Sequence, residues 1–213
     1  MFTNSETEQQ VAEFLLQIKA IKLQPNNPFT WASGWKSPIY CDNRITLSFP
    51  TIRTYIRQQL SSVIQEKFGA VGCIAGVATA GIPQGALVAQ ELGLPFIYVR
   101  AKAKEHGTGS LIEGEISTDK RVVVIEDLIS TGKSSLQAVA ALRDAGYNVA
   151  GLAAIFSYGF DLAEENFKNA KCPFVTLSNY TALLKYAEEK QYISESDIEI
   201  LKKWREEPST WGQ

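Results

Sequence analysis

The chain has 213 residues, which is enough for one α/β domain with a sizeable core. Hydrophobic residues make up 45% and charged residues 21%, so a largely disordered or collagen-like chain is excluded. The 21 Lys and Arg residues nearly balance the 23 Asp and Glu residues, and the net charge of −2 argues against nucleic-acid binding as the main role. The single histidine, His106, excludes a His-rich metal centre.

The cysteines and the N-terminal segment indicate a cellular compartment. Cys41, Cys73 and Cys172 lie far apart without a Cys-x-x-Cys pair, which argues against a disulfide scaffold or a zinc ribbon. The segment MFTNSETEQQ lacks the pattern of a signal peptide, and no apolar run approaches the roughly 20 residues that span a bilayer. We therefore expect a cytoplasmic protein that associates with neither membranes nor nucleic acid.

The first third of the chain predicts two helices with an irregular segment between them. Apolar residues at helical spacing predict a helix over 5–20, capped by Ser5 or Thr7. Several prolines among aromatic residues then predict a turn-rich lobe with one short strand, and we call residues 20–48 the hood because they could cover a site. Pro50 begins a second helix that ends near Gly69.

The rest of the chain alternates between short apolar runs and helical patterns. The apolar runs predict strands at 71–77, 96–99, 122–125, 149–156 and 174–177. The segments between them predict helices at 82–92, 133–145 and 162–169. This order predicts an α/β fold with a mostly parallel central sheet flanked by helices and a small N-terminal hood. Two tail helices follow, one after Ser178 or Asn179 and one after Ser194 or Ser196, where Ser196 and Glu199 fit a capping box.

The segment RVVVIEDLISTGKSSLQAVAALRDAG, residues 121–146, carries the strongest signal of chemistry. Its strand ends in Glu126 and Asp127 at the carboxyl edge of the sheet, where open α/β folds bind ligands. The loop 128–133, which contains the hydroxyl groups of Ser130 and Thr131 and also Gly132, then leads into a helix. This arrangement favours a phosphate, so we call the segment the phosphate loop. A Walker A loop is excluded because Asp127 stands where that motif needs glycine, and a dinucleotide fingerprint is absent. The acids suit ribose hydroxyls and the loop suits a 5-phosphate, whereas the alternative is a solvated strand end before an ordinary helix.

Two further segments suit an anionic ligand. In GVATAGIPQGA, residues 76–86, small residues let backbone amides approach a ligand before a helix, although tight helix–sheet packing explains them nearly as well. In YVRAKAKEHGTGSLIEGE, residues 98–115, basic residues and His106 form a long loop that could close on a departing anion. The alternative for this loop is an ordinary solvated hairpin.

Together with FTWASGWKSPIYCDNR, these segments resemble the orotate phosphoribosyltransferase family, a branch of the type I phosphoribosyltransferases, across essentially the whole chain. The resemblance implies a single domain, 1–213, with residues 100–116 as a mobile catalytic loop. It implies Mg²⁺-dependent transfer of ribose 5-phosphate from 5-phosphoribosyl-1-diphosphate to orotate, giving orotidine 5′-monophosphate and diphosphate. It also implies a homodimer in which the loop reaches the neighbouring subunit's site.

The resemblance assigns roles residue by residue. The expected catalytic residues are Lys104, His106 and Asp127, with Mg²⁺ held mainly by the diphosphate. The expected contacts of the phosphoribosyl diphosphate are Thr79, Ala80, Arg100, Lys104, His106, Glu126, Asp127, Leu128, Ile129, Ser130, Thr131, Gly132, Lys133 and Ser134. The expected contacts of orotate are Ser130, Lys36, Tyr40 and Tyr158.

The chain departs from the longer bacterial branch of this family. Ala32 stands where that branch has a lysine, Thr79 and Ala80 replace Tyr-Lys, and an orotate-binding arginine is replaced near Tyr158. What neutralises the orotate carboxylate is therefore open among Lys36, Arg44 and backbone amides. The competing functions are a purine or xanthine phosphoribosyltransferase and a regulator that senses the diphosphate sugar without chemistry. A regulator should carry a basic extension, but Lys19 and Lys22 are the only bases in the first 30 residues.

Overall fold

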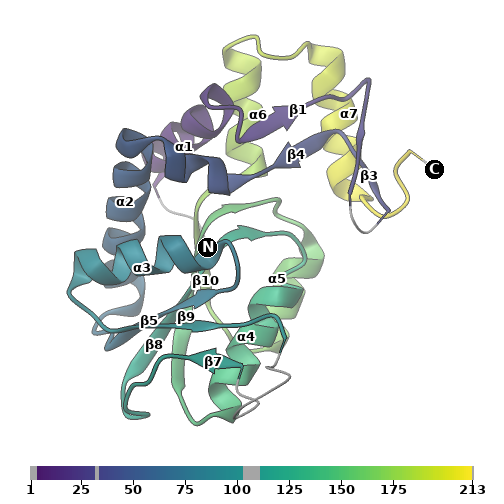
Figure 1. The fold of residues 1–213 in the computed structure, drawn as a ribbon. Coiled ribbons are helices and arrows are strands. Elements are labelled where there is room, and N and C mark those ends of the chain that lie inside the picture. The colour runs from purple at the N-terminus through teal and green to yellow at the C-terminus, as the bar shows by residue number, and fades with distance from the viewer. Residues whose placement is uncertain (1–3, 32–33, 103–110, 213) are drawn as a thin grey trace.

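A computed structural model describes residues 4–31, 34–102 and 111–212 and contains a six-stranded central sheet (Figure 1). Its strand order is β10-β9-β8-β5-β6-β7, and every neighbouring pair is parallel except β6 with β7. The strands are β5 (Cys73–Val77), β6 (Phe96–Val99), β7 (Ile112–Glu113), β8 (Arg121–Ile129), β9 (Asn148–Ser157) and β10 (Phe174–Asn179). The predicted α/β fold with a mostly parallel sheet is confirmed.

Helices cover both faces of this sheet because its strands are apolar on both sides. Val123 and Ile125 pack in one core with the helices α1 (Ser5–Gln17), α2 (Pro50–Phe68) and α3 (Gly81–Leu92). Val122 and Val124 pack in a second core with α4 (Lys133–Asp144) and α5 (Asp161–Asn169). The continuous apolar runs of the sequence follow from this burial on both faces.

The hood contains four short strands, so the prediction of one was wrong. β1 (Ile21–Leu23) pairs with β4 (Ile39–Cys41), and β2 (Phe29–Thr30) pairs with β3 (Lys36–Ser37), both antiparallel. Strands of two or three residues are too short to show alternation in a sequence. The 3₁₀-helix η1 (Asn43–Ser48) then leads to α2.

Both ends of the chain build the upper part of the molecule in Figure 1. The helices α6 (Tyr180–Glu189) and α7 (Glu195–Glu206) lie beside the hood strands. Trp204 of α7 is fully buried, and its ring centroid lies 5.6 Å from those of Trp31 in the hood and Tyr158 after β9. This aromatic cluster joins the hood to the end of the central sheet.

Helix ends account for the remaining differences from the sequence predictions. The side chain of Asn4, rather than Ser5 or Thr7, caps α1 by accepting a hydrogen bond from the Thr7 amide (2.8 Å). The capping box of α7 is formed by Ser194 and Asp197, whereas Glu199 pairs with a lysine on the next turn. The predicted α2 is confirmed from Pro50 to its end before Gly69, and Asn179 caps α6. Among the described residues, none of the helices combines the length and apolarity needed to cross a membrane.

Candidate active site

Glu126 and Asp127, which we call the acid pair, lie within β8 rather than at its end. The strand continues through Ile129, and Leu128 and Ile129 pair with Phe156 and Ser157 of β9. Glu126 is only 5% exposed, and its two oxygens accept hydrogen bonds from the Asp127 amide (3.0 Å) and from the Ser135 hydroxyl (3.2 Å). The strand is longer than predicted because two acids interrupt its apolar run without interrupting the β8–β9 ladder.

Burial and mutual repulsion control the charge of this pair. Burial raises the pKa of Glu126 well above its usual value, and the neighbouring Asp127 charge raises it further. Burial also raises the pKa of Asp127, while the hydrogen bond with Glu126 and the Arg44 charge act in the opposite direction. The pair therefore keeps a proton to a higher pH than exposed carboxyl groups would, and this proton must leave before both groups can accept hydrogen bonds.

The predicted phosphate loop leads directly into α4. Gly132 has φ +76°, and an added Cβ would lie 2.6 Å from the Phe167 ring, so the loop fits closely against α5. The Thr131 carbonyl accepts a hydrogen bond from Asn166 of α5 (3.0 Å). No described side chain caps α4, which leaves the amides of its first turn available to an anion. Lys133 and Ser134 in that turn are exposed.

The turn at 78–80 lies beside the acid pair because two glycines allow close packing. Thr79 is exposed at the carboxyl edge of the sheet, and the Ala78–Thr79 peptide bond is cis. A Cβ on Gly81 would lie 2.4 Å from the Ile125 carbonyl oxygen, and one on Gly76 would lie 2.9 Å from that of Gly81. Tight helix–sheet packing is thus present here, and it brings the turn next to the end of β8.

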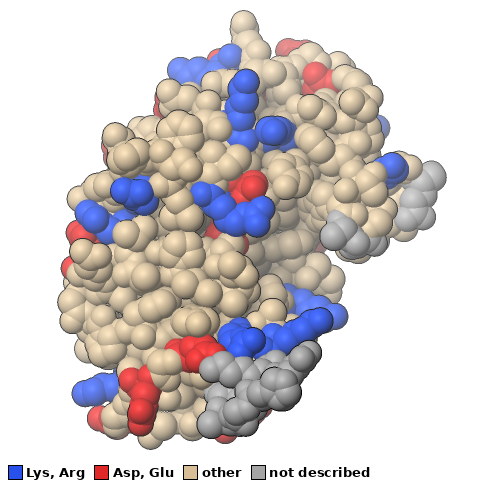
Figure 2. Space-filling model, viewed as in Figure 1, with Lys and Arg blue, Asp and Glu red and all other residues tan. Residues whose placement is uncertain are grey.

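Arg100, Ala78 and Leu111 line one cavity of about 380 Å³ together with one side of α4, from Ser134 in its first turn to Asp144 in its last. The three segments singled out in the sequence therefore meet at one place. The Arg100 guanidinium lies 3.4 Å from the Glu113 carboxylate, and its amide donates to the Leu111 carbonyl (2.8 Å). Figure 2 shows a group of Lys and Arg side chains in the region of α4 and β7. Lys104 and His106 lie outside the described residues.

The predicted orotate residues of the hood have other partners in this structure. The Lys36 ammonium donates to the Thr30 hydroxyl (2.8 Å), and the Tyr40 ring lies 5.5 Å from that of Phe29. Lys36 and Tyr40 are both exposed, whereas Tyr158 is 2% exposed within the aromatic cluster. Burial raises the pKa of the Tyr158 phenol well above its usual value, so the phenol stays neutral.

A second cavity is lined by residues of both the hood and the phosphate loop. It has a volume of about 770 Å³ and extends between α5 and the C-terminal segment. Trp35 of the hood and Thr131 of the phosphate loop both line it.

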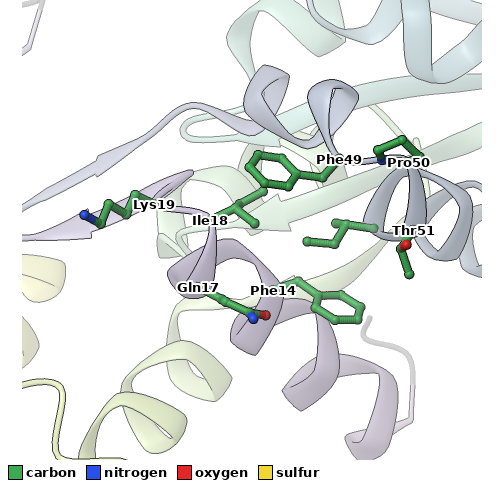
Figure 3. Close-up of a pocket in the computed structure, with 8 residues that line it drawn as sticks. Phe14, Gln17, Ile18, Lys19, Phe49, Pro50 and Thr51 are labelled. Atoms are coloured by element: carbon green, nitrogen blue, oxygen red, sulfur yellow. The ribbon is translucent and has the colours of Figure 1, made fainter.

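A cavity of about 600 Å³ between α1 and α2 contains none of the predicted site residues. Phe14, Ile18 and Phe49 give it a mainly apolar lining (Figure 3). It therefore offers no chemistry of the predicted kind.

Two buried polar residues contact the acid pair but were not among the sequence predictions. Asn43 donates from its side-chain amide to the Asp127 main-chain carbonyl (2.7 Å), and Ser135 donates to Glu126. Ser135 falls in the first turn of the predicted helix, but no pattern distinguishes it from its neighbours. Asn43 lies 84 residues before Asp127 and stands in the segment FTWASGWKSPIYCDNR, but nothing in that segment indicates a contact with the acid pair.

The acid pair supplies only some of the ligands that a bound metal ion needs. Within the described segments, no three His, Cys, Asp or Glu side chains group in a way that could hold a metal. Carboxylate oxygens are nevertheless the ligands that Mg²⁺ prefers, and Mg²⁺ usually takes one or two of them together with substrate phosphates. The acid pair fits that mode of binding.

Comparisons with known proteins agree with this geometry. The family model of the phosphoribosyl transferase domain matches residues 48–185. An orotate phosphoribosyltransferase of Phocaeicola vulgatus is 59% identical over 96% of both chains, and one of Listeria innocua is 54% identical over 97% of this chain and 99% of its own. The crystal structure of orotate phosphoribosyltransferase from Aeropyrum pernix superposes with a TM-score of 0.73 at 28% identity, covering 86% of this chain and 99% of its own.

Proposed function

The chain belongs to the orotate phosphoribosyltransferase family, and we propose how its own residues carry out the reaction of that family. The enzyme transfers ribose 5-phosphate from 5-phosphoribosyl-1-diphosphate to orotate, a step of pyrimidine nucleotide synthesis that yields orotidine 5′-monophosphate and diphosphate. The 59% identity over 96% of both chains is the observation that carries this conclusion. It favours orotate over a purine as the base.

The acid pair binds the ribose. Once Glu126 and Asp127 have lost their shared proton, both accept hydrogen bonds from the ribose hydroxyls. As the bond from C1 to the diphosphate breaks, positive charge develops on the sugar ring, and the nearby carboxylates stabilise that charge. The amides of residues 130–134 hold the 5-phosphate at the N-terminus of α4. N1 of orotate then forms the new bond to C1 and gives up its own proton, for which the departing diphosphate is an available base, and no covalent intermediate on the protein is needed.

The basic loop and the turn at 78–80 act on the leaving group. Arg100 lines the same cavity as Ala78 and Ser134, which supports a role for it in binding the diphosphate. Lys104 and His106 are assigned to the same anion by resemblance alone. Mg²⁺ bound to the diphosphate would supply further charge neutralisation, and the acid pair is the nearby carboxylate set that could complete its coordination. The Tyr158 phenol and Tyr40 are proposed at the orotate end of the site, with Ser130 and Lys36.

Assembly and location are part of this proposal. We expect a homodimer in which the loop of one subunit completes the site of the other, and a hood that covers the base. Three free cysteines and substrates of intracellular metabolism support a cytoplasmic location.

The test of the proposed function is turnover by the purified full-length chain. With Mg²⁺ and 5-phosphoribosyl-1-diphosphate, the ultraviolet absorbance of orotate should fall as orotidine 5′-monophosphate forms. Asp127→Asn should slow this change strongly without unfolding the protein. Turnover of hypoxanthine, xanthine or uracil without turnover of orotate would refute the assignment.

A further inference from the structure

The side chain of Asn43 joins the hood to the catalytic strand through a buried hydrogen bond. Asn43 is 1% exposed, and its amide nitrogen lies 2.7 Å from the Asp127 carbonyl oxygen. Its amide oxygen accepts a hydrogen bond from the Cys41 thiol (3.3 Å). The opposite amide orientation would place two oxygens 2.7 Å apart, so the carbonyl of Asp127 fixes which end of the amide faces it.

The main chain of Asn43 is connected to α3 through two further buried side chains. The Asn43 carbonyl accepts a hydrogen bond from the Thr46 hydroxyl (2.6 Å), which in turn accepts one from the Gln84 amide (3.1 Å). Thr46 and Gln84 are at most 1% exposed. Since α3 begins directly after the turn at 78–80, hydrogen bonds connect Asn43 both to the acid pair and to the helix that follows the diphosphate turn.

The position of Asp127 in the sheet explains why the hydrogen bond from Asn43 matters. The β5–β8 ladder ends where Gly76 pairs with Ile125, so Glu126 and Asp127 extend past the last residue pair of that ladder. A main-chain carbonyl left without a partner in this buried region would lose its hydration without a hydrogen bond in return, which destabilises the local structure. The Asn43 amide supplies that partner, and it does so from a segment that also carries Tyr40 and Cys41.

We propose that Asn43 is a positioning residue for Asp127, holding the acid pair in place relative to the hood that covers the base. The inference rests on the proposed function. Removing the amide frees the Asp127 peptide to shift, which moves the carboxylate away from the ribose. A misplacement of about 1 Å can cost on the order of 100-fold in rate, so kcat should fall far more than the KM values change.

Three variants separate positioning from a general loss of stability. Asn43→Ala removes the donor together with most of the side chain, and Asn43→Leu removes the donor while keeping a side chain of the same branched shape. Ser178→Ala is the matched control, because Ser178 is fully buried and also donates to a distant main-chain carbonyl, that of Glu8 (2.8 Å). Its element, β10, contributes no residue to the proposed site.

The division of the effect between kcat and KM adds a readout that a purely structural role would not move. Positive charge develops at C1 only as the bond to the diphosphate breaks, so a displaced Asp127 carboxylate loses most of its effect in the transition state. The KM values for orotate and 5-phosphoribosyl-1-diphosphate should therefore stay within about threefold of the wild type in the Asn43 variants, while kcat falls.

Steady-state orotate consumption, with circular dichroism of each variant to confirm folding, decides the outcome. Asn43→Ala is expected to lose about 10- to 100-fold in kcat, while Ser178→Ala stays within about threefold of the wild type. A folded Asn43→Ala with kcat within threefold of the wild type would overturn the inference. If Asn43→Ala does not fold, a folded Asn43→Leu with kcat within threefold of the wild type overturns it. An inactive wild type would instead reject the proposed function itself.

Discussion

Substitution of Gly81 by alanine tests whether close packing of α3 positions the diphosphate turn. An added Cβ would lie 2.4 Å from the Ile125 carbonyl oxygen, about 1 Å inside the 3.4 Å at which ordinary contact begins. Both atoms belong to backbone or are fixed to it, so neither can rotate away. The first turn of α3 must move away from β8, and the turn at 78–80 must move with it.

The size of the effect follows from this displacement. Overpacking of a buried site costs about 1–3 kcal/mol, which lowers Tm by about 2–12 °C for a chain of this size. A shift of about 1 Å at the diphosphate predicts a loss on the order of 100-fold in kcat/KM for 5-phosphoribosyl-1-diphosphate. Thermal unfolding and initial rates of orotate consumption measure the two quantities.

Gly72→Ala is the control for this experiment. Gly72 lies just before β5, at the opposite end of that strand from the site, and the three atoms nearest its added Cβ all belong to the side chain of Lys120, with Cδ at 2.9 Å and Cβ at 3.0 Å. The outer atoms of that half-exposed side chain can rotate away, whereas its Cβ is fixed to the backbone, so some loss of Tm is expected. Because this contact lies at the far end of the strand, Gly72→Ala should keep the kcat/KM of the wild type. If Gly81→Ala keeps that kcat/KM as well, close packing at Gly81 does not position the turn.

Three other predictions concern charge and assembly. The Ser135 hydroxyl lowers the pKa of Glu126, so Ser135→Ala should move the acid limb of kcat/KM to higher pH, and an unmoved limb contradicts the shared-proton account. The pKa of Glu126 is higher folded than unfolded, so its carboxyl group loses stabilising effect as the pH rises through the folded value. The Tm advantage of Glu126→Gln over the wild type should therefore grow between pH 5 and 8, which thermal unfolding measures. If the loop acts across subunits, mixing inactive Lys104→Ala and Asp127→Asn should restore about a quarter of wild-type activity, since half of randomly exchanged dimers hold one intact site. No recovery despite proven exchange would place each site within one chain.

The central sheet was predictable because its strands are buried on both faces. Runs such as Val122–Ile125 stay apolar without alternation, and glycine or proline marks the ends of the helices between them. The same criterion predicted that β8 ends too early, at residue 125. Glu126 and Asp127 are polar, although the ladder with β9 continues past them. In the hood, pairs of two or three residues are set by contacts between segments and leave no periodic pattern.

The candidate site was predictable where its residues are consecutive and unpredictable where they are distant. The acid pair, the phosphate loop and the start of α4 follow one another in the chain, so one motif identifies them. The contact between Asn43 and Asp127 spans 84 residues and exists only because η1 folds over the end of β8. Ser135 shows a second limit, because helical periodicity does not indicate which hydroxyl faces a buried carboxylate.

The burial of Tyr158 limits which groups can neutralise the carboxylate of orotate. A buried, neutral phenol can donate a hydrogen bond but cannot balance a charge, so the candidates in the hood are its cations Lys36, whose ammonium donates to the Thr30 hydroxyl, and Arg44. Arg44 is the hood cation whose charge lowers the pKa of Asp127, so it lies on the side of the acid pair. Its Nε and Nη2 atoms bind Asp42 (2.6 and 2.9 Å), which orients the guanidinium while Nη1 keeps two donors for another carboxylate. The arrangement therefore favours Arg44. Because Arg44 directly follows Asn43, the hydrogen bond that holds Asp127 also sets the position of this cation relative to the ribose.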